Sequence, residues 1–249
     1  METLTPIARD ALEFKDRLLR MKEQLEPPSF WYPYDTLANF IHLGKLDTGD
    51  RLSLEKLRGL TIADVGAADG DIAFYLESLG NKVDIVDHAP TNFNGLRGAA
   101  RMKEHLGSSV TINDVDLDDF FALPREQYDV VFFLGILYHL KNPFNIMERL
   151  ARRAGTCLLS TKVAKYAGSP AMRIASLPVA YLLGPLESNN DPTNFWVFSD
   201  AGLKRLLDRA GWDVVSYATV GDVIASDPAA PQHDERAFCY LRSRYQAES

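Results

Sequence analysis

Cysteine is scarce in this sequence, long apolar runs are missing, and positive charge is in the minority. Two of the 249 residues are cysteines, Cys157 and Cys239, and both stand in apolar runs. This pattern argues against a disulfide framework and favours a reducing compartment. No stretch approaches the roughly 18 apolar residues of a membrane span, and the opening METLTPIARD lacks the apolar core of a secretory signal. We therefore expect a cytoplasmic protein without a membrane partner.

Metal-ligand patterns and an excess of basic residues are missing too. The five histidines are scattered, with no His-x-x-x-His or Cys-x-x-Cys pair, so no metal site is predicted. Lys and Arg number 27 against 34 Asp and Glu, a formal net charge of −7. That balance argues against a broad surface that wraps nucleic acid, while it leaves room for a local basic patch. The composition, 46% apolar, is that of a globular chain.

Apolar runs and helical periodicities alternate along most of the chain. The predicted helices are 5–26, 71–79, 92–106, 143–153 and 200–210, the last two with Asn142 and Ser199 as their N-caps. The predicted strands are 61–65, 82–87, 110–115, 128–135, 157–163, 212–220 and 236–242. This order predicts an α/β fold with a doubly wound, mostly parallel seven-stranded sheet whose last strand is antiparallel. Residues 1–59 are a predicted helical and aromatic extension, and residues 60–249 a main domain with a lid-like insertion at 164–197.

The chemistry of the sequence concentrates where the first predicted strand meets its helix, in Asp64-Val-Gly-Ala-Ala-Asp-Gly70. A dinucleotide fingerprint reads G-x-G-x-x-G, but here Ala68 and Asp71 occupy its second and third glycine positions, which favours a ligand without phosphates. Asp64 suits a cationic amine, and Asp87, at the end of the second strand, suits the two hydroxyls of a ribose or is a solvated strand end. Asp114 suits an adenine amino group, with the Val115 N–H beside it.

These motifs, in this order, make residues 60–163 resemble a class I S-adenosylmethionine-dependent methyltransferase, which has a Rossmann-like fold. The segments Val131–Pro143 and Asn194–Lys204 resemble a subgroup that contains tRNA wobble-uridine carboxymethyl-transfer enzymes and small-molecule O-methyltransferases. The resemblance implies S-adenosyl-L-methionine as cofactor and S-adenosyl-L-homocysteine as product. The predicted cofactor-binding residues are Asp64, Gly66, Ala67, Ala68, Asp87, His88, Asp114, Val115, Leu134, Gly135 and Tyr138.

Acceptor recognition is predicted from residues beyond the carboxyl ends of the strands. Tyr138 and His139 are the predicted catalytic residues; His139 is a candidate base or, alternatively, orders its loop through a backbone hydrogen bond. The aromatic stretch before residue 35 lines the pocket or fixes the N-terminal helix to the body, and the insertion forms a polar wall or an ordinary surface loop. The predicted substrate-binding residues are Trp31, Tyr32, Tyr34, His139, Glu187, Asn190, Asn194, Trp196 and Arg236.

Three functions follow from these patterns. The first is a methyltransferase that acts on a small molecule, with O-methylation of a sugar or secondary metabolite as the leading hypothesis. The second is tRNA wobble-uridine methyl or carboxymethyl transfer. The resemblance implies that a carboxylated cofactor is held by the tyrosine matching Tyr138, by an arginine for which Arg236 is a candidate, and by a lysine whose place Trp31 takes. The third is a non-catalytic, cofactor-binding partner subunit of another enzyme. The missing lysine and the acidic net charge favour the first.

Overall fold

The computed structural model describes residues 4–46, 54, 57–168 and 171–246, and it divides into two compact units, Met1–Phe132 and Phe133–Ser249. Parts of the predicted extension (1–3, 47–53 and 55–56) and of the predicted insertion (169–170) lie outside the described residues. All described residues of the predicted extension belong to unit 1. The two units meet between Phe132 and Phe133, within a strand, and not at the end of the extension. The division into units therefore does not test whether the extension is a separate domain, which remains a prediction.

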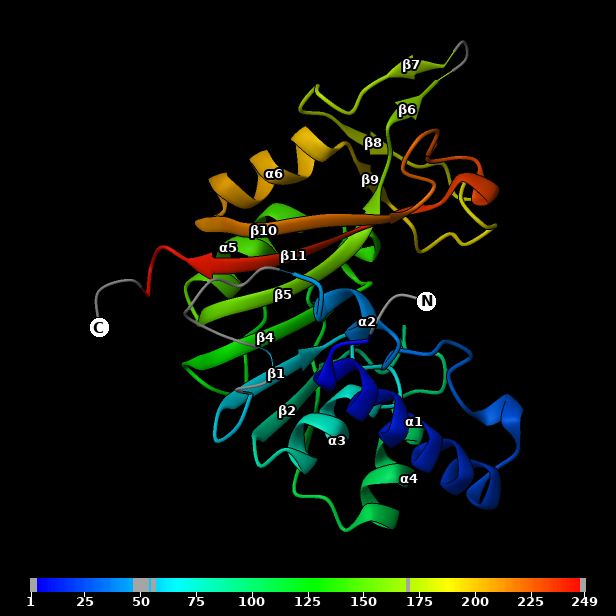
Figure 1. Ribbon diagram of the computed structural model, residues 1–249, viewed down its shortest axis with the longest axis vertical. Coiled ribbons are helices and arrows are strands. Elements are labelled where there is room, and N and C mark those ends of the chain that lie inside the picture. Colours follow the sequence, from blue (N-terminus) through cyan, green and yellow to red (C-terminus); the bar gives the residue numbers. More distant parts are fainter. Residues whose placement is uncertain (1–3, 47–53, 55–56, 169–170, 247–249) are drawn as a thin grey trace. The chain divides into compact units, whose positions relative to one another are not determined.

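Unit 1 is built on three parallel strands, β1 (Thr61–Val65), β2 (Lys82–Asp87) and β3 (Thr111–Asp114), joined through α3 (Asp71–Ser78) and α4 (Arg97–Leu106) (Figure 1). Four successive residues in each of β1 and β2 are buried, as expected where helices cover both faces of a parallel sheet. Around these elements lie α1 (Pro6–Leu25), the 3-10 turn η1 (Pro28–Phe30) and the short α2 (Asn39–Leu43).

The helix predicted at residues 5–26 is confirmed as α1. It ends where Glu26 turns extended before Pro27, because the residue before a proline is disfavoured in the helical region. Its buried face packs on α3, where the rings of Phe14 and Tyr75 lie 5.5 Å apart. The Tyr75 hydroxyl donates to the Ile7 carbonyl at 3.3 Å, so α1 is fixed to the first helix of the parallel sheet.

Unit 2 is built on antiparallel strands, β5 (Ala154–Val163), β11 (Glu235–Ser243) and β10 (Trp212–Gly221). Its helices are α5 (Pro143–Ala151) and α6 (Asp200–Arg209), and its 3-10 turns are η3 (Leu137–His139) and η4 (Pro231–His233). The side chains of Asn142 and Ser199 accept from the backbone N–H of Asn145 and Gly202, respectively, so both predicted N-caps are confirmed.

The predicted mixed sheet is confirmed. Its strand order is β10-β11-β5-β4-β1-β2-β3, with β4 (Tyr128–Leu134) containing the residue where the two units divide. Within the described residues, the insertion adds two strands to the seven expected: β9 (Trp196–Phe198) pairs parallel with β5 at Val163↔Phe198, and β8 (Ala180–Leu182) pairs antiparallel with β9. The insertion also forms a small hairpin of β6 (Tyr166–Ala167) and β7 (Met172–Arg173).

The largest error in a predicted boundary lies at the start of α4. The helix expected from residue 92 begins at Arg97, because Leu96 adopts a left-handed conformation (φ 65°) and the Asn92 side chain holds a turn. The Asn92 amide oxygen accepts from the N–H groups of Asn94 and Leu96, both at 3.1 Å. Among the described helices, none combines the length and the apolar character that crossing a membrane requires.

Candidate functional site

The glycine-rich loop after β1 holds a strained backbone close to β2. Gly66, Ala68 and Gly70 all have positive φ, of 72°, 55° and 81°. A Cβ added at Gly70 would lie 2.7 Å from Ile85 Cδ1, so glycine is required there. Ala68 adopts a conformation that disfavours a side chain, and its N–H thereby donates to the Asp87 carboxylate at 3.0 Å.

Asp87 lies at the end of β2 and is held by three donors. Its carboxylate accepts from the N–H of His88 at 2.8 Å, from Ala68 and from the Asn92 amide at 3.1 Å. Burial raises the pKa of Asp87, while these hydrogen bonds oppose the rise. Asn92 was not predicted as a site residue; its placement depends on the turn that replaces the start of the predicted helix. Asp87 therefore has a fixed orientation beside the glycine-rich loop.

Asp64, the one acidic residue of β1, is 3% exposed. Within the described residues, its Oδ2 has no hydrogen-bond partner. Burial, followed by the charge of Asp87, raises its pKa from 3.8 to about 8. A buried carboxyl oxygen without a partner next to a loop of small residues fits the predicted role of accepting a cationic amine, since such a ligand would supply both the hydrogen bond and the countercharge.

The predicted adenine position is partly wrong. The Val115 N–H donates to the Asp87 carbonyl at 2.9 Å, because the hydrogen bonding between β2 and β3 extends one residue beyond Asp114. This N–H is therefore not available to a ligand. The Asp114 carboxylate accepts from the Ala89 N–H at 2.9 Å, and His88 Nδ1 lies 3.4 Å from the Thr91 hydroxyl. The ligand contacts of Asp114 and His88 remain predictions.

A buried lysine, not predicted as a site residue, ties α1 to the glycine-rich loop. Lys22 is 6% exposed, and its ammonium lies 3.2 Å from the Asp69 carboxylate and 2.8 Å from that of Asp71. Asp69 also accepts from the Asn94 amide at 2.7 Å and from the Tyr32 N–H at 2.8 Å. This network, Lys22-Asp69-Asp71-Asn94, fixes the C-terminal end of the loop that carries the motif.

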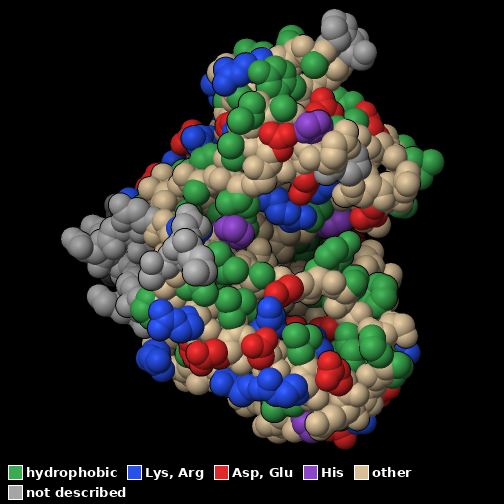
Figure 2. Space-filling model, turned by 45° about the vertical axis from the view of Figure 1, so that its right-hand side comes forward, with side chains coloured by type: hydrophobic (Ala, Val, Ile, Leu, Met, Phe, Trp, Pro, Cys, Tyr) green, Lys and Arg blue, Asp and Glu red, His purple; other side chains and the backbone are tan. Residues whose placement is uncertain are grey.

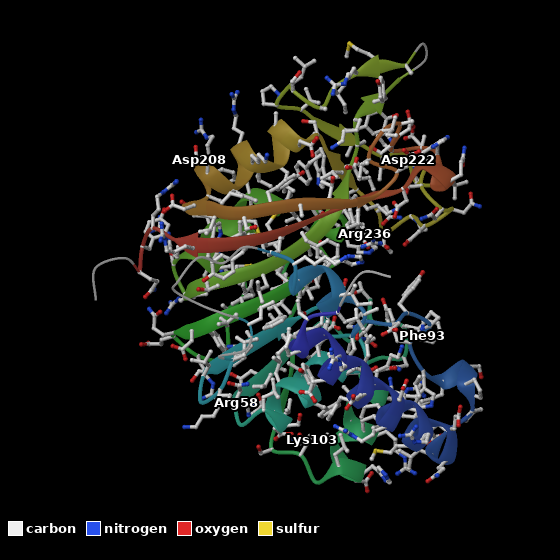
Figure 3. The ribbon with its side chains drawn as sticks, in the orientation of Figure 1. Arg58, Phe93, Lys103, Asp208, Asp222 and Arg236 are labelled. Carbon is white, nitrogen blue, oxygen red and sulfur yellow. The ribbon has the colours of Figure 1, made fainter. Side chains whose placement is uncertain are left out.

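The aromatic residues before residue 35 have two different surroundings: Trp31 is buried, whereas Tyr34 is exposed. The Trp31 indole N–H donates to the carbonyls of Lys22 and Glu26 at 3.2 and 3.3 Å, and its ring is buried, so it fixes the N-terminal helix as the alternative interpretation expected. Tyr32 packs on Tyr34 and on Phe93, with ring centroids 5.6 and 5.8 Å apart. Phe93, on the loop after β2 (Figure 3), was not predicted; it and Tyr34 are 56% and 72% exposed.

In unit 2, η3 presents Tyr138 and His139 directly after β4. His139 Nδ1 lies 3.1 Å from the Thr193 carbonyl, which can only accept, and 3.0 Å from the Thr193 hydroxyl, whose own hydrogen is donated to Asp191. Both oxygens therefore accept from Nδ1, so Nδ1 carries the proton and Nε2 is the acceptor atom of the neutral ring. Burial lowers the pKa of His139 below its usual 6.5, and the charges of Arg236 and Lys162 act in the same direction. The imidazole is therefore neutral at pH 7, with its acceptor atom defined.

Gly135, one of the predicted cofactor-binding residues, has φ 74°. A Cβ built there would lie 3.7 Å from Arg236 Nη1 and 3.8 Å from the Tyr138 hydroxyl. Arg236 comes from the start of β11 (Figure 3), and its Nη2 donates to the Tyr138 hydroxyl at 3.4 Å. Unit 2 thus brings Arg236, from the last strand, next to Gly135 and Tyr138, which lie three residues apart in the sequence. The side chain of Leu134, the last residue of β4, is half-buried.

The predicted substrate-binding residues of the insertion fall into two groups. Glu187 accepts from the Tyr181 hydroxyl and from the Gly184 N–H, and Asn190 is exposed with φ 52°, so both shape the loop itself. Asn194 and Trp196 are different: within the part of the chain that the structure describes, the Asn194 amide oxygen and the Trp196 indole N–H are buried without a partner. Their polar atoms keep them as candidates for substrate contact.

A family model described as a methyltransferase domain matches residues 37–217, which is more than half of the chain. The chain belongs to the methyltransferase-domain family. This membership confirms the class I methyltransferase assignment made from the motifs. No curated protein is significantly similar to the methyltransferase in sequence.

Solved structures share the fold of this methyltransferase at low sequence identity. The N-terminal domain of EvdMO1, crystallised with SAH, is 17% identical with a TM-score of 0.57, and the match covers 92% of this chain and 97% of that one. The [4+2]-cyclase SpnF is 15% identical, with a TM-score of 0.55 and coverages of 75% and 76%. An S-adenosylmethionine-dependent methyltransferase from Mesorhizobium loti is 15% identical with a TM-score of 0.55, and the match covers 75% of this chain and 92% of that one. These likenesses bear out the Rossmann-like fold.

Proposed function

We propose that this methyltransferase transfers the methyl group of S-adenosyl-L-methionine to an oxygen atom of a small-molecule acceptor, a sugar or secondary metabolite, and releases S-adenosyl-L-homocysteine. The observation that carries the proposal is the pair of carboxyls at the glycine-rich loop, Asp64, which is buried, and Asp87, which is half-buried. EvdMO1, a neighbour in fold, was crystallised with SAH and in the presence of D-fucose. SpnF has the same fold and is a [4+2]-cyclase, so the fold alone does not define the reaction.

In the proposed reaction, the chain binds and orients the cofactor and provides a base. The cofactor would supply an electrophilic methyl group. Asp64 would accept the amine of its amino-acid tail, and Asp87, oriented by Ala68, His88 and Asn92, would accept the ribose hydroxyls. His139 Nε2 would take the proton of an acceptor hydroxyl, because the ring is neutral and its Nδ1–H is directed to Thr193.

Carboxymethyl transfer to tRNA is the second candidate, and the contact between Arg236 and Tyr138 favours it, since the resemblance implies this pair for a carboxylated cofactor. The face drawn in Figure 2 argues against a tRNA partner. Figure 2 shows Lys and Arg side chains interspersed with Asp and Glu, and in α1 Lys15 pairs with Asp35 at 3.0 Å while Lys22 is buried. Strongly salt-dependent tRNA binding would support the second candidate, whereas absent or salt-insensitive binding would reject it.

The acceptor class is tested by turnover. The purified chain is incubated with S-adenosyl-L-methionine and a low-molecular-weight extract, and products that gain one methyl group are identified by mass spectrometry. We expect a methylated hydroxyl compound and equimolar S-adenosyl-L-homocysteine. Methylation of nitrogen or carbon alone would reject O-methylation. Turnover by the isolated protein would also exclude the non-catalytic partner subunit.

Replacing His139 by Asn separates its two candidate roles. The Asn amide still donates to the Thr193 carbonyl in place of Nδ1–H, but it offers no base at the position of Nε2. We expect kcat on the identified acceptor to fall by about 10²–10⁴-fold, the usual contribution of a general base, with unchanged affinity for S-adenosyl-L-homocysteine. The wild-type kcat/KM should rise with pH through a pKa below 6.5, because burial lowers that of His139. Activity retained in H139N would show that the ring only orders its loop.

A further inference from the structure

Two cations face each other across neighbouring strands of unit 2. Arg236 on β11 is the register partner of Lys162 on β5 in an antiparallel pair. Side chains directly opposite in such a pair emerge on the same face, about 5 Å apart at Cβ, and like charges there destabilise the sheet. Lys162 is also 6% exposed, and burying an ammonium is costly. Sheet stability therefore does not account for this pair.

Both cations converge on the ring of Tyr138. The Arg236 guanidinium carbon lies 5.6 Å from the ring centroid and the Lys162 ammonium 5.9 Å from it. Since Arg236 Nη2 donates to the Tyr138 hydroxyl, that oxygen acts as an acceptor toward Arg236 and directs its own O–H elsewhere. The Tyr138-Arg236-Lys162 cluster thus combines two positive charges with a hydroxyl donor.

Asp234 partly neutralises the cluster. Its carboxylate lies 3.1 Å from Lys162 Nζ and 3.7 Å from Arg236 Nε, and Lys162 also donates to the Ser188 hydroxyl at 3.3 Å. The three charged side chains together carry a net charge of +1. The side chains of Asp234 and Arg236 are 40% and 35% exposed, so a ligand can reach them from solvent. The Asp234 carboxylate occupies the position in which the two cations would stabilise the anionic group of a ligand.

We propose that the Tyr138-Arg236-Lys162 cluster binds an anionic group, a carboxylate or a phosphate, of the methyl acceptor. Arg236 would contact the anion with two parallel N–H donors, the geometry that carboxylates and phosphates share. The Tyr138 hydroxyl would add a third donor, and Lys162 would add a second positive charge. The acceptor is therefore an acidic small molecule. This assignment of the anion to the acceptor rests on the proposed function; the anion site itself does not.

Nitrogen-15 spectra of arginine-labelled full-length protein test the site. Inorganic phosphate and acetate are titrated separately at constant ionic strength, and the Arg236 Nε–H signal is assigned by its loss in Arg236→Gln. We expect that signal to shift and saturate, while the signal of Arg242 stays in place. Arg242 is the matched internal control, because it lies on the same strand and pairs with Asp213 at 3.5 Å. If phosphate saturates the signal at a lower concentration than acetate does, the acceptor carries a phosphate group. If acetate saturates it at the lower concentration, the acceptor carries a carboxylate.

Two variants distinguish a binding site from a structural cluster. Lys162→Met should weaken anion binding about tenfold or more, and Asp234→Asn should tighten it several-fold, because the internal competitor is removed. A purely structural cluster would not bind more tightly after losing Asp234. The inference is overturned if neither anion saturates the Arg236 signal, if Arg242 shifts equally, or if Asp234→Asn weakens binding.

The source of the anion and the proposed function are tested on the same samples. S-adenosyl-L-homocysteine is titrated in parallel. If the protein binds S-adenosyl-L-homocysteine but neither anion, the anion site is rejected and the proposed function stands. If it binds an anion but not S-adenosyl-L-homocysteine, the proposed function is rejected and the anion site stands. A preference for carboxylated over ordinary S-adenosyl-L-methionine that Arg236→Gln abolishes would assign the anion to the cofactor and overturn the acceptor assignment.

Discussion

Asp64→Asn is expected to remove a pH-dependent loss of stability from the wild-type protein. The pKa of Asp64 is about 8 in the folded chain, against 3.8 when exposed, and burial is the main cause. Between these values the folded carboxyl holds a proton that the unfolded one has lost, so the free energy of unfolding falls as pH rises. The slope is about 1.4 kcal/mol per pH unit, and the total loss is several kcal/mol by about pH 8. An Asn side chain has nearly the same shape and does not titrate.

Urea unfolding at about pH 5, 7 and 9 measures this difference. We expect Asp64→Asn to be more stable than wild type at the highest pH and close to it at the lowest. Asp84→Asn is the matched control on the neighbouring strand. Burial raises the pKa of Asp84, but hydrogen bonds from Arg125, Thr111 and Tyr128 outweigh burial and lower it. Asp84→Asn should therefore destabilise the protein above pH 4. Parallel pH profiles for wild type and Asp64→Asn would contradict the account.

The same variant tests the proposed contact with the cofactor. An amine that approaches Asp64 stabilises the carboxylate, so wild-type binding at pH 7 should release a proton, seen as buffer-dependent binding enthalpy. Asn carries no charge, and we expect S-adenosyl-L-homocysteine affinity to fall about 10- to 100-fold, the scale of a hydrogen bond to a charged group. Unchanged affinity, with no proton release in either protein, would remove Asp64 from the site.

Lys22→Met is expected to lower stability by about 3–5 kcal/mol. Lys22 is buried and lies within 3.2 Å of two carboxylates that are themselves largely buried, Asp69 and Asp71. Removing the cation leaves both negative charges without their countercharge, which costs far more than losing an exposed ion pair. In a chain of this size, a loss of about 3–5 kcal/mol lowers Tm by roughly 6–20 °C. Cofactor affinity should fall as well, because Asp69 and Asp71 flank Gly70 of the glycine-rich loop.

Lys15→Met is the control for this prediction, because Lys15 lies on the same helix and pairs with Asp35 at 3.0 Å, but both side chains are partly exposed. We expect it to cost at most about 1 kcal/mol. Adding Asp71→Asn to Lys22→Met should restore part of the stability, and so should acidic pH, since both remove negative charge. Equal effects of Lys22→Met and Lys15→Met would show that the buried network contributes no more than a surface pair.

The sequence predicted best what depends on neighbouring residues. The bounds of β1 and β2 agree with the predicted strands because each is an apolar run buried in the sheet and followed by a glycine or an acidic turn. Asp64, Asp87 and the N-caps Asn142 and Ser199 could be placed because a strand end or helix start fixes their position.

What the sequence could not predict depends on distant residues or on a one-residue register. Lys22 bonds to residues 47 and 49 positions away, and its own signal was a charge four residues after the buried Leu18. Lys162 became a candidate only when the register placed it opposite Arg236. The Val115 N–H is not available to a ligand because it donates to the Asp87 carbonyl, one further hydrogen bond between β2 and β3. Residue types alone do not predict where such a ladder of hydrogen bonds ends.

Titration calorimetry of the full chain with S-adenosyl-L-homocysteine tests the central claim most directly. We predict one site per chain, an affinity lowered by about 1–3 kcal/mol in Asp87→Ala, and no change in Glu104→Ala, which alters an exposed carboxylate on α4. Failure of the wild-type protein to bind either S-adenosyl-L-homocysteine or S-adenosyl-L-methionine would contradict the account.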